Sequence, residues 1–594
     1  MTKVHVEPIG VTVEIPDGDT LLTAITAAAV DVRTDCQGRG TCGKCLIRVG
    51  AGGFTEPTEI ETARIPPAKL AQGWRLACQT WPLSPKVSIE VRETQGKRRI
   101  PTASQLTGGK LRPAVRKEHV CFPPATLDDP RADVERVTAT LGVRGLRLSV
   151  IRRLPDLLRD DGFCAVVTRY GAQVIDVEPA AVEPRAFGAA VDIGTSKVIV
   201  YLYDLGDGRR VDQEALENPQ MRYGEDVVTR MTQAVHHGLL AELTAAVRGG
   251  INELLATLCA RQEIEPRHVY DMTIVGNTVM HHLALGISPL GMSAAPFAPA
   301  LAEPATERAA DLGLAMNPEG GVHFPPPIAG FVGSDALAVI AATRLAGKRR
   351  PALAIDIGTN TEIAVAVGGR IVVTSAASGP AFEGYQMSCG MKAVEGAIER
   401  VRFTPDGEPK RIETIGGRPA VGICGSGVVD VLAGLVAAGV VDPSGRLQPH
   451  PRVRQSATSN GLEYFLTAGT SGDIVFTQHD VRALQLAMGA IASAWTLLLE
   501  NVGLGVDDLC HVYVAGAFGN YLDPANSVAL GLLPPVPRER IVFVGNAAGV
   551  GAQMALVDER ARRRMAALRR RISFLDLATD SGFHEVFTGK LTFV

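Results

Sequence analysis

Apolar and polar residues alternate near the start of the chain, which is typical of short, half-buried strands. Residues 3–15, KVHVEPIGVTVEI, alternate on both sides of a Pro-Ile-Gly turn and predict a β-hairpin. Residues 19–30, DTLLTAITAAAV, predict a helix with Asp19 or Thr20 as its N-cap. The stretches CLIRVG and KVSIEV add further strands. We therefore expect a small α+β domain over residues 1–93.

The pattern is then lost over residues 94–117, which are rich in glycine, proline and basic residues. This composition predicts a flexible basic linker. Residues 118–187 regain periodicity, with a helix-like stretch at 147–161 and two strands within 163–179, and predict a small middle domain. We expect the linker and this middle domain to let the first domain swing.

From residue 188 onward, long apolar strands alternate with helices, which indicates a large α/β unit over residues 188–594. This unit contains an internal repeat. AAVDIGTSKVIVYLYDLGDGRRV at 189–211 parallels LAIDIGTNTEIAVAVGGRIVV at 353–373. Each copy reads as a buried strand, then Asp-Ile-Gly-Thr, then a second strand. The repeat predicts two related lobes.

Composition and charge narrow the picture without naming a function. The 594 residues are 46% hydrophobic and 21% charged, with a net charge of −3, so nothing global points to nucleic acid or a membrane. The N-terminus has no apolar signal region, and no uninterrupted apolar run of about 18 residues suggests a membrane span. We expect a cytoplasmic protein.

Ten cysteines are present, four of them within the first eighty residues. Such a distribution is not that of a disulfide framework. We expect the other six to be buried apolar thiols, with Cys389 and Cys424, both in glycine-rich loops, as candidates for the active cleft. These six are Cys121, Cys164, Cys259, Cys389, Cys424 and Cys510.

The clustered cysteines follow the spacing Cys-x5-Cys-x2-Cys, with a distant fourth in RLACQT. Zinc sites usually pair their ligands in two knuckles, whereas three ligands in one loop favour a 2Fe-2S cluster. Four free or zinc-bound thiols are the alternative. Glycines within the loop would turn backbone amides toward the sulfur atoms. The predicted ligands are Cys36, Cys42, Cys45 and Cys78, and the glycines are Gly38, Gly40 and Gly43.

The two Asp-Ile-Gly-Thr motifs indicate a second functional site, one that binds phosphate. A strand that ends in aspartate and runs into Gly-Thr places a carboxylate beside amides and hydroxyls that can bind phosphate oxygens. Asp192 and Asp356 could hold hydrated Mg²⁺, which takes few protein ligands. The predicted phosphate contacts are Gly194, Thr195 and Ser196 in the first motif, and Gly358, Thr359 and Asn360 in the second.

Two resemblances follow from these motifs. Residues 1–93, with the four cysteines and the hairpin–helix lead-in, resemble the 2Fe-2S ferredoxins and imply a β-grasp fold. The repeat resembles the phosphate motifs of the superfamily of acetate and sugar kinases, heat-shock chaperones and actin, and implies a two-lobed, ribonuclease H-like ATPase domain that binds ATP. VYVAGAFGNYLD at 512–523 is similar to its adenosine motif, which implies contacts from Gly516, Ala517 and Gly519.

The same resemblance implies a catalytic group just before the second phosphate motif. Asp335, in GFVGSDALAVIAATRL, would orient the attacking water or hydroxyl. The alternative is that Ser334-Asp335 caps the helix that follows. Glu362 is a further carboxylate candidate, or a surface strand residue. His281 and His282, in an amphipathic helix, fit packing better than metal binding.

The complete chain resembles the reductive activators of corrinoid proteins, in which a ferredoxin domain, a linker, a middle domain and an ATPase domain follow in this order. That resemblance implies ATP-driven one-electron reduction of an inactive Co(II) corrinoid to Co(I). It implies as partner a corrinoid protein or a cobalamin-dependent methyltransferase, methionine synthase among the candidates. It also implies an upstream electron donor and a homodimer through the ATPase domain. Two alternatives stay open: a small-molecule kinase with a redox-sensing ferredoxin domain, and an ATP-dependent clamp without redox catalysis.

Overall fold

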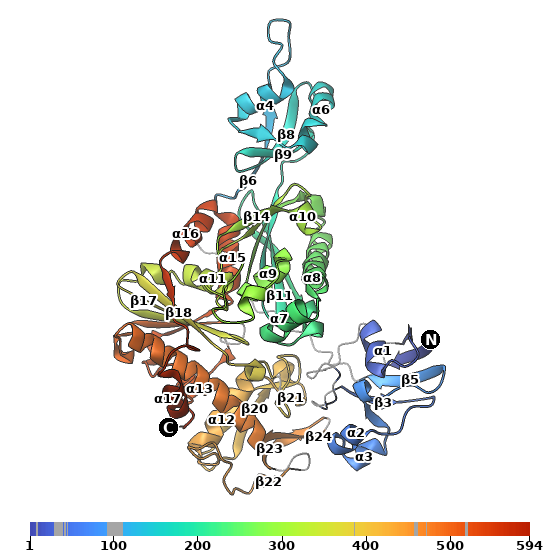
Figure 1. The fold of residues 1–594 in the computed structure, drawn as a ribbon, viewed down its shortest axis with the longest axis vertical. Helices are drawn as coiled ribbons and strands as arrows, with labels where there is room; N and C mark the ends of the chain where they lie inside the picture. Colours follow the sequence, from blue (N-terminus) through green and yellow to red (C-terminus); the bar gives the residue numbers. More distant parts are fainter. Residues whose placement is uncertain are drawn as a thin grey trace.

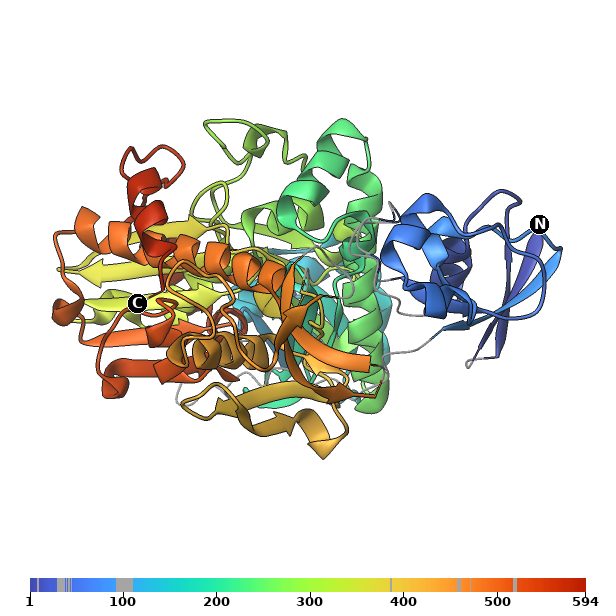
Figure 2. The same cartoon turned by 90° about the horizontal axis from the view of Figure 1, so that it is seen from below.

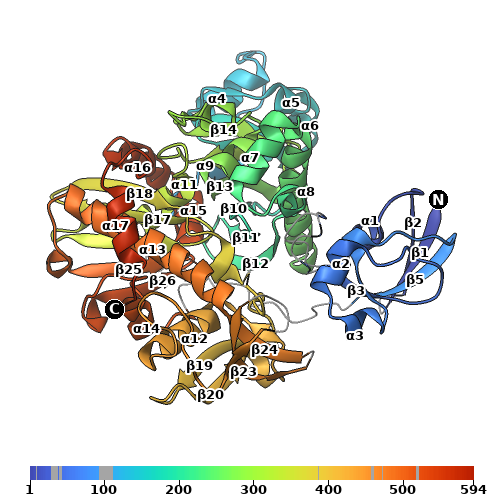
Figure 3. The ribbon, with the colours of Figure 1, turned by 60° about the horizontal axis from the view of Figure 1, so that its bottom comes forward.

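The computed structural model describes residues 1–7, 10–28, 38, 40, 43, 45–91, 111–384, 387–456, 461–470, 472–516 and 521–593. The large α/β unit forms two lobes, and the small domain of residues 115–179 stands at one end of them (Figure 1). The N-terminal domain lies to one side of the lobes in all three views (Figures 1, 2 and 3).

The N-terminal domain is a five-stranded sheet covered by short helices. The predicted hairpin forms as two antiparallel strands, and the predicted helix begins after Thr20. The sheet order is β2-β1-β5-β3-β4. The strands are β1 (Thr2–Glu7), β2 (Val11–Ile15), β3 (Leu46–Val49), β4 (Trp74–Leu76) and β5 (Lys86–Val91), and the helices are α1 (Leu21–Ala27), α2 (Glu59–Arg64) and α3 (Pro67–Leu70).

The small domain that follows is a four-stranded sheet, β6-β8-β9-β7, with three helices. The helix-like stretch at 147–161 divides into two short helices, and a proline stands in the first turn of the second. The end of the predicted linker is ordered, since residues 115–117 open β6. The elements are β6 (Val115–Cys121), α4 (Asp133–Leu141), β7 (Gly145–Leu146), α5 (Leu148–Ile151), α6 (Leu154–Asp160), β8 (Cys164–Tyr170) and β9 (Gln173–Pro179).

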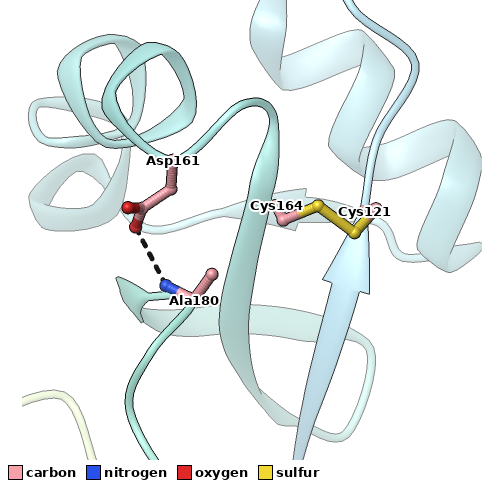
Figure 4. The surroundings of a disulfide bond; sticks show 4 residues. All are labelled: Cys121, Asp161, Cys164 and Ala180. Atoms are coloured by element: carbon pink, nitrogen blue, oxygen red, sulfur yellow. Dashed lines mark hydrogen bonds between the residues drawn. A yellow bond between two sulfur atoms is a disulfide. The ribbon is translucent and has the colours of Figure 1, made fainter.

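Two cysteines of this domain are joined, which the sequence did not lead us to expect. Cys121 and Cys164 form a disulfide between β6 and β8, where they stand opposite each other in the antiparallel pair (Figure 4). The prediction of buried free thiols was therefore wrong for this pair. Strand pairing between positions distant in the chain brings the two Cα atoms within 4.0 Å, which spacing alone does not reveal.

The small domain is fastened to the first lobe by a buried polar interface. Arg562, from α16 (Glu559–Arg569), donates to Asp271 of β13 (Val269–Gly276), a strand of that lobe, at 2.5 Å. It also donates to the hydroxyl of Tyr170, from β8 of the small domain, at 2.7 Å. Nearby, the hydroxyl of Tyr270 donates to Asp176 of β9 at 3.2 Å. Breaking this interface would expose buried charges, so it holds the small domain against the lobe. The expectation that the linker and this domain let the first domain swing stays a prediction.

Lobe I is built on the six-stranded sheet β12-β11-β10-β13-β15-β14, and lobe II on the sheet β26-β25-β16-β17-β18-β27. The strands of lobe I are β10 (Phe187–Ile193), β11 (Lys197–Asp204), β12 (Arg210–Glu217), β13 (Val269–Gly276), β14 (Ala305–Arg308) and β15 (Gly321–Phe324). Those of lobe II are β16 (Ala352–Ile357), β17 (Thr361–Val367), β18 (Arg370–Ala376), β25 (His511–Ala515), β26 (Ile541–Gly545) and β27 (Ile572–Phe574).

The internal repeat of the sequence is a repeat of topology. In lobe I, β10 pairs antiparallel with β11 and parallel with β13. In lobe II, β16 pairs antiparallel with β17 and parallel with β25. Asp192 and Asp356 hold the same place, one residue before the end of β10 and of β16. The predicted two-lobed fold is confirmed.

Helices cover and join the lobes. The buried cluster that contains α11 and α15 also includes residues of both large sheets, among them Tyr201 and Ala354, so these helices connect the lobes. The helices are α7 (Val227–His236), α8 (Leu240–Arg261), α9 (Thr278–Leu285), α10 (Ala309–Leu312), α11 (Ser334–Ala342), α12 (Gly425–Ala437), α13 (Gln478–Asn501), α14 (Pro524–Ala529), α15 (Ala547–Val557), α16 (Glu559–Arg569) and α17 (Phe583–Lys590).

Lobe II carries two smaller sheets, of order β20-β19-β21 and β22-β23-β24. Their strands are β19 (Ala397–Phe403), β20 (Pro409–Thr414), β21 (Gly422–Ile423), β22 (Val453–Gln455), β23 (Leu462–Gly469) and β24 (Gly472–Thr477). Among the described residues, α13 is long and apolar enough to cross a membrane, but 78% of its most apolar window is buried within the protein. Packing in the core of lobe II accounts for its composition.

Candidate cluster and nucleotide sites

Two of the four predicted cluster ligands are described, and they lie together. Cys45 precedes β3, Cys78 follows β4, and the Cys45 thiol donates to the Cys78 sulfur over 3.3 Å. This bond, together with an amide donated by Gly40, lowers the pKa of Cys78 to about 6 against the opposing effect of burial. Cys36 and Cys42 lie outside the described residues.

The loop around these thiols depends on glycine. Gly38, Gly40 and Gly43 have φ values of 84°, 76° and 68°, in the left-handed region that other residues avoid. A Cβ at Gly40 would lie 2.9 Å from the side chain of Ile60 and 3.0 Å from that of Gln79. At these three positions the backbone can approach the sulfur atoms, and the two described thiols are of the ligand type that a 2Fe-2S cluster takes.

The second site is a cavity of about 270 Å³ between the lobes. Both Asp-Ile-Gly-Thr turns face it, so the structure brings together groups that are far apart in the chain. The predicted residues that line it are Asp192, Gly194, Thr195, Ser196, Asp335, Asp356, Gly358, Thr359, Asn360, Glu362 and Gly516. Ala517 and Gly519 lie outside the described residues.

Four partly buried carboxyl groups dominate the electrostatics of this cavity. Burial raises the pKa of Asp192 to about 6, of Asp335 to about 7 and of Asp356 to about 8, and it raises the pKa of Glu362 as well. The neighbouring carboxylates raise the last three further by repulsion. A cation in the cavity would relieve this repulsion.

The carboxylates fit Mg²⁺ better than a metal held by protein alone. Among the described residues, no three His, Cys, Asp or Glu side chains come close enough to hold a metal by themselves. Mg²⁺ usually keeps several waters and binds through one or two carboxylates and the phosphates of its substrate.

Helix starts surround the same cavity. Asn277 caps α9, Asp335 lies in the first turn of α11, Cys424 precedes α12, and Asn546 caps α15. All four residues line the cavity. The N-terminus of a helix presents unpaired N–H groups and a partial positive charge, which favour phosphate. The residues present therefore fit a nucleotide with its phosphates.

Asp335 faces the cavity rather than capping its helix. The N-cap of α11 is Gly333, and no side chain caps this helix. Among the hydrogen bonds described for its side chain, the Asp335 carboxylate accepts the neighbouring amide of Ala336 at 2.8 Å and no amide further along the first turn. Ser334 instead bonds the backbone of Gly276. The capping alternative is therefore wrong, while the catalytic role stays a prediction.

Sequence reasoning missed two asparagines that support the first phosphate turn. Asn546 donates to Asp192 at 2.7 Å while its carbonyl oxygen caps α15 through Gly549. Asn218 donates to the carbonyl oxygen of Gly194 at 2.8 Å. For Asn546, the sequence does contain a signal: in FVGNAAGVG an asparagine stands between a strand and a glycine-rich helix, which is typical of an N-cap.

The remaining candidate residues, two cysteines and two histidines, differ in whether they lie at the cavity. Cys424 lines the cavity, whereas Cys389 accepts the amide of Val475 at 3.4 Å and does not line it. His282 accepts backbone amides of Ala300 and Leu301, so it holds a loop in place. His281 packs edge-on against the ring of Phe324. Both histidines are buried, as the packing interpretation required.

Comparison with known proteins supplies the context for these two sites. The family description "2Fe-2S iron-sulfur cluster binding domain" matches residues 4–83, and "RACo linker region" matches 104–184. "RACo middle region" matches residues 187–348, and "C-terminal domain of RACo the ASKHA domain" matches 350–594. The small domain thus corresponds to the linker description, and lobe I to the middle description.

A relative from Eubacterium limosum, "Corrinoid activation enzyme RamQ", is 33% identical over 93% of this chain and 92% of its own length. The chain belongs to the family of reductive activators of corrinoid proteins. A solved structure, "Reductive activator for corrinoid,iron-sulfur protein", is 31% identical, covers 100% of this chain and 98% of its own, and superposes with a TM-score of 0.76.

A further relative matches this chain over only about half of each sequence. "[Co(II) methylated amine-specific corrinoid protein] reductase" from Methanosarcina barkeri is 30% identical over 46% of this chain and 51% of its own length. The family descriptions support a 2Fe-2S cluster in the N-terminal domain and an ATPase-type domain at the C-terminus. They confirm the fold class and the family that the sequence indicated.

Proposed function

We propose that this activator uses ATP to drive the transfer of one electron to a Co(II) corrinoid on a partner protein, which becomes Co(I). One observation carries the proposal: a cavity enclosed by two Asp-Ile-Gly-Thr turns belongs to the same chain as the paired thiols Cys45 and Cys78. The full-length likeness to a corrinoid activation enzyme supports the same conclusion.

Energetics explain why an electron carrier would be joined to an ATPase. Plant-type 2Fe-2S clusters have potentials near about −0.4 V. Transfer of one electron costs about 1.4 kcal/mol for each 59 mV uphill, so an acceptor roughly 0.2 V lower costs about 5 kcal/mol. A nucleotide-dependent change in a two-state complex can supply a free energy of this size.

The residues divide the work between the two sites. Cys36, Cys42, Cys45 and Cys78 would hold the cluster, which supplies one-electron transfer when bound. Asp192 and Asp356 would position hydrated Mg²⁺, while the glycines and hydroxyls of the two turns bind phosphate oxygens. Asp335, which lines the same cavity and has a raised pKa, would orient the attacking water and accept its proton.

The partner is a corrinoid protein or a cobalamin-dependent methyltransferase, with methionine synthase one candidate, and the electron enters from a separate reductase or carrier. The small domain meets lobe I through Tyr170, whose hydroxyl accepts from Arg562 and donates to Asp271. We expect the basic linker predicted from the sequence to let the N-terminal domain reach its partner.

The test is ATP-dependent reduction of a purified Co(II) corrinoid protein, followed by the visible spectrum of the cobalt. We expect Co(I) to form with MgATP and a reductant, and not after Cys78→Ser or Asp356→Ala. If ATP has no effect on the reduction of any corrinoid protein supplied, the proposal fails. A phosphorylated small molecule formed without a redox partner would favour a kinase, and activity that survives Cys78→Ser would favour a clamp.

A further inference from the structure

An ion pair connects the two lobes at the wall of the nucleotide cavity. Glu217, from β12 of lobe I, pairs with Lys392, from the segment that precedes β19 in lobe II. Both side chains line the cavity, and each is 25% exposed. Because they come from different lobes, the pair can form only when the lobes are close together.

On the lobe I side, Glu217 is connected to the first phosphate turn. It stands opposite Lys197 in the β11–β12 pair, directly after the Gly194-Thr195-Ser196 turn. The next residue, Asn218, donates from its side chain to the carbonyl oxygen of Gly194 at 2.8 Å, and from its amide to that of Ser196 at 3.0 Å. A force on Glu217 would therefore reach the turn through two hydrogen bonds.

On the lobe II side, Lys392 is connected to the start of α12. The amide of Met391 donates to Ile423 at 2.8 Å, and the amide of Ile423 donates to Cys389 at 2.8 Å. Ile423 ends β21, and the next residue, Cys424, begins the turn that opens α12 into the cavity. The segment that carries Lys392 thus moves together with one of the helix starts that face the phosphates.

We propose that Glu217 and Lys392 form a latch that closes lobe I on lobe II around the bound nucleotide and slows its release. The inference rests on the proposal that the cavity binds ATP, and it deepens that proposal by naming the contact that retains the nucleotide. Opening the lobes would separate the pair and return both charges to water. The pair therefore favours the closed arrangement by the modest amount that a partly exposed ion pair supplies.

The direct test is the dissociation rate of an N-methylanthraniloyl-labelled ATP from the full chain in Mg²⁺, chased with unlabelled ATP in a stopped-flow fluorimeter. We expect Glu217→Gln to speed dissociation by about two- to fivefold, the range of a partly exposed pair. Raising the salt concentration should speed release from the wild type and have little effect on Glu217→Gln. Glu217→Asp, which keeps the charge, should lie between the two.

A double-mutant cycle separates the latch from a direct contact between Lys392 and the phosphates. If the two residues act through each other, Glu217→Gln should add nothing to the rate of Lys392→Met. Glu214→Gln is the matched control, since Glu214 lies on the same strand but pairs with Arg261 of α8, within lobe I. We expect its rate to equal that of the wild type.

The latch is refuted if Glu217→Gln releases nucleotide no faster than Glu214→Gln, or if the two latch substitutions act additively. The assay contains no corrinoid, so its outcome is independent of the proposed reduction. A wild type that reduces no corrinoid, with latch variants that still release nucleotide faster, would refute the proposed function and leave the latch standing.

Discussion

Gly516 lies directly against the carbonyl oxygen of Ile357, and a Cβ at position 516 would come within 2.3 Å of that oxygen. Ile357 ends β16, the strand that carries Asp356, and Gly516 follows β25, its parallel neighbour. The φ of Gly516 is +99°, which disfavours any other residue. The second phosphate turn and the segment of the predicted adenosine motif are thus packed backbone against backbone.

Gly516→Ala should therefore displace the second phosphate turn. We expect a loss of about 1–3 kcal/mol of stability, as for other overpacked sites, and weaker ATP binding. Calorimetric titration with MgATP and thermal unfolding would measure the two effects. Gly238→Ala is the control, because Gly238 also has a positive φ, +70°, but has no atom within 4 Å of its Cβ position. ATP affinity equal in both variants would contradict this account.

The raised pKa of Asp356 predicts that a substitution can stabilise the protein while abolishing its activity. With a folded-state pKa of about 8, this carboxyl keeps a proton that the unfolded chain releases near pH 4. The folded state therefore binds more protons between these values, and stability falls as pH rises through that window. Asp356→Asn removes the ionisable group and therefore this loss of stability at higher pH.

Without nucleotide or Mg²⁺, we expect Asp356→Asn to unfold at a higher temperature than the wild type at pH 8, with the difference shrinking toward pH 5. ATP hydrolysis should be lost at both pH values. Asp207→Asn, at a site 59% exposed, is the control and should change neither property. A difference in melting temperature that does not depend on pH would show that ionisation is not its cause.

The elements that could be predicted from the sequence are mostly those encoded by short, contiguous segments. The Asp-Ile-Gly-Thr turns and the hairpin at 3–15 are encoded within a few residues each, so their strands and the place of Asp192 and Asp356 followed directly. The bond from Asn546 to Asp192 could not follow, because 354 residues separate the two. Contacts of this kind arise from the packing of the lobes, which periodicity does not specify.

The contact between the small domain and lobe I could not be predicted for a similar reason. Nothing in the sequence shows that Arg562, within an arginine-rich helix that reads as exposed, is buried against Asp271 and Tyr170. The buried contacts of Arg562 with Asp271 and Tyr170 thus join the small domain to lobe I, which the sequence does not reveal.

Arg562→Gln should loosen this junction strongly. It would leave Asp271, which is fully buried, without its cationic partner, and loss of one member of a buried pair typically costs about 3–5 kcal/mol. Limited proteolysis of the full chain should then release the small domain faster. Arg563→Gln is the matched control, since Arg563 is the next residue of α16 and its side chain is 68% exposed. Equal proteolysis rates in the two variants would argue against a rigid junction.

The disulfide between Cys121 and Cys164 should hold the small domain together independently of that junction. It closes a 43-residue segment that contains α4, α5 and α6. In the chain-entropy account, a loop of this length contributes roughly 4 kcal/mol by restricting the unfolded state. Cys164→Ser should therefore lower the midpoint of thermal unfolding, and a phosphine reductant should lower the wild-type midpoint while leaving that of Cys164→Ser unchanged.

Alkylation of the denatured chain before and after reduction, read by peptide mass spectrometry, shows directly whether the two cysteines are linked. Cys259, which is buried and free, is the internal control: it should be labelled without reductant, whereas Cys121 and Cys164 should be labelled only after reduction. Labelling of both before reduction would contradict the linkage in solution. In that case the antiparallel pairing of β6 with β8, which places the two residues opposite each other, would have to hold these strands without a covalent bond.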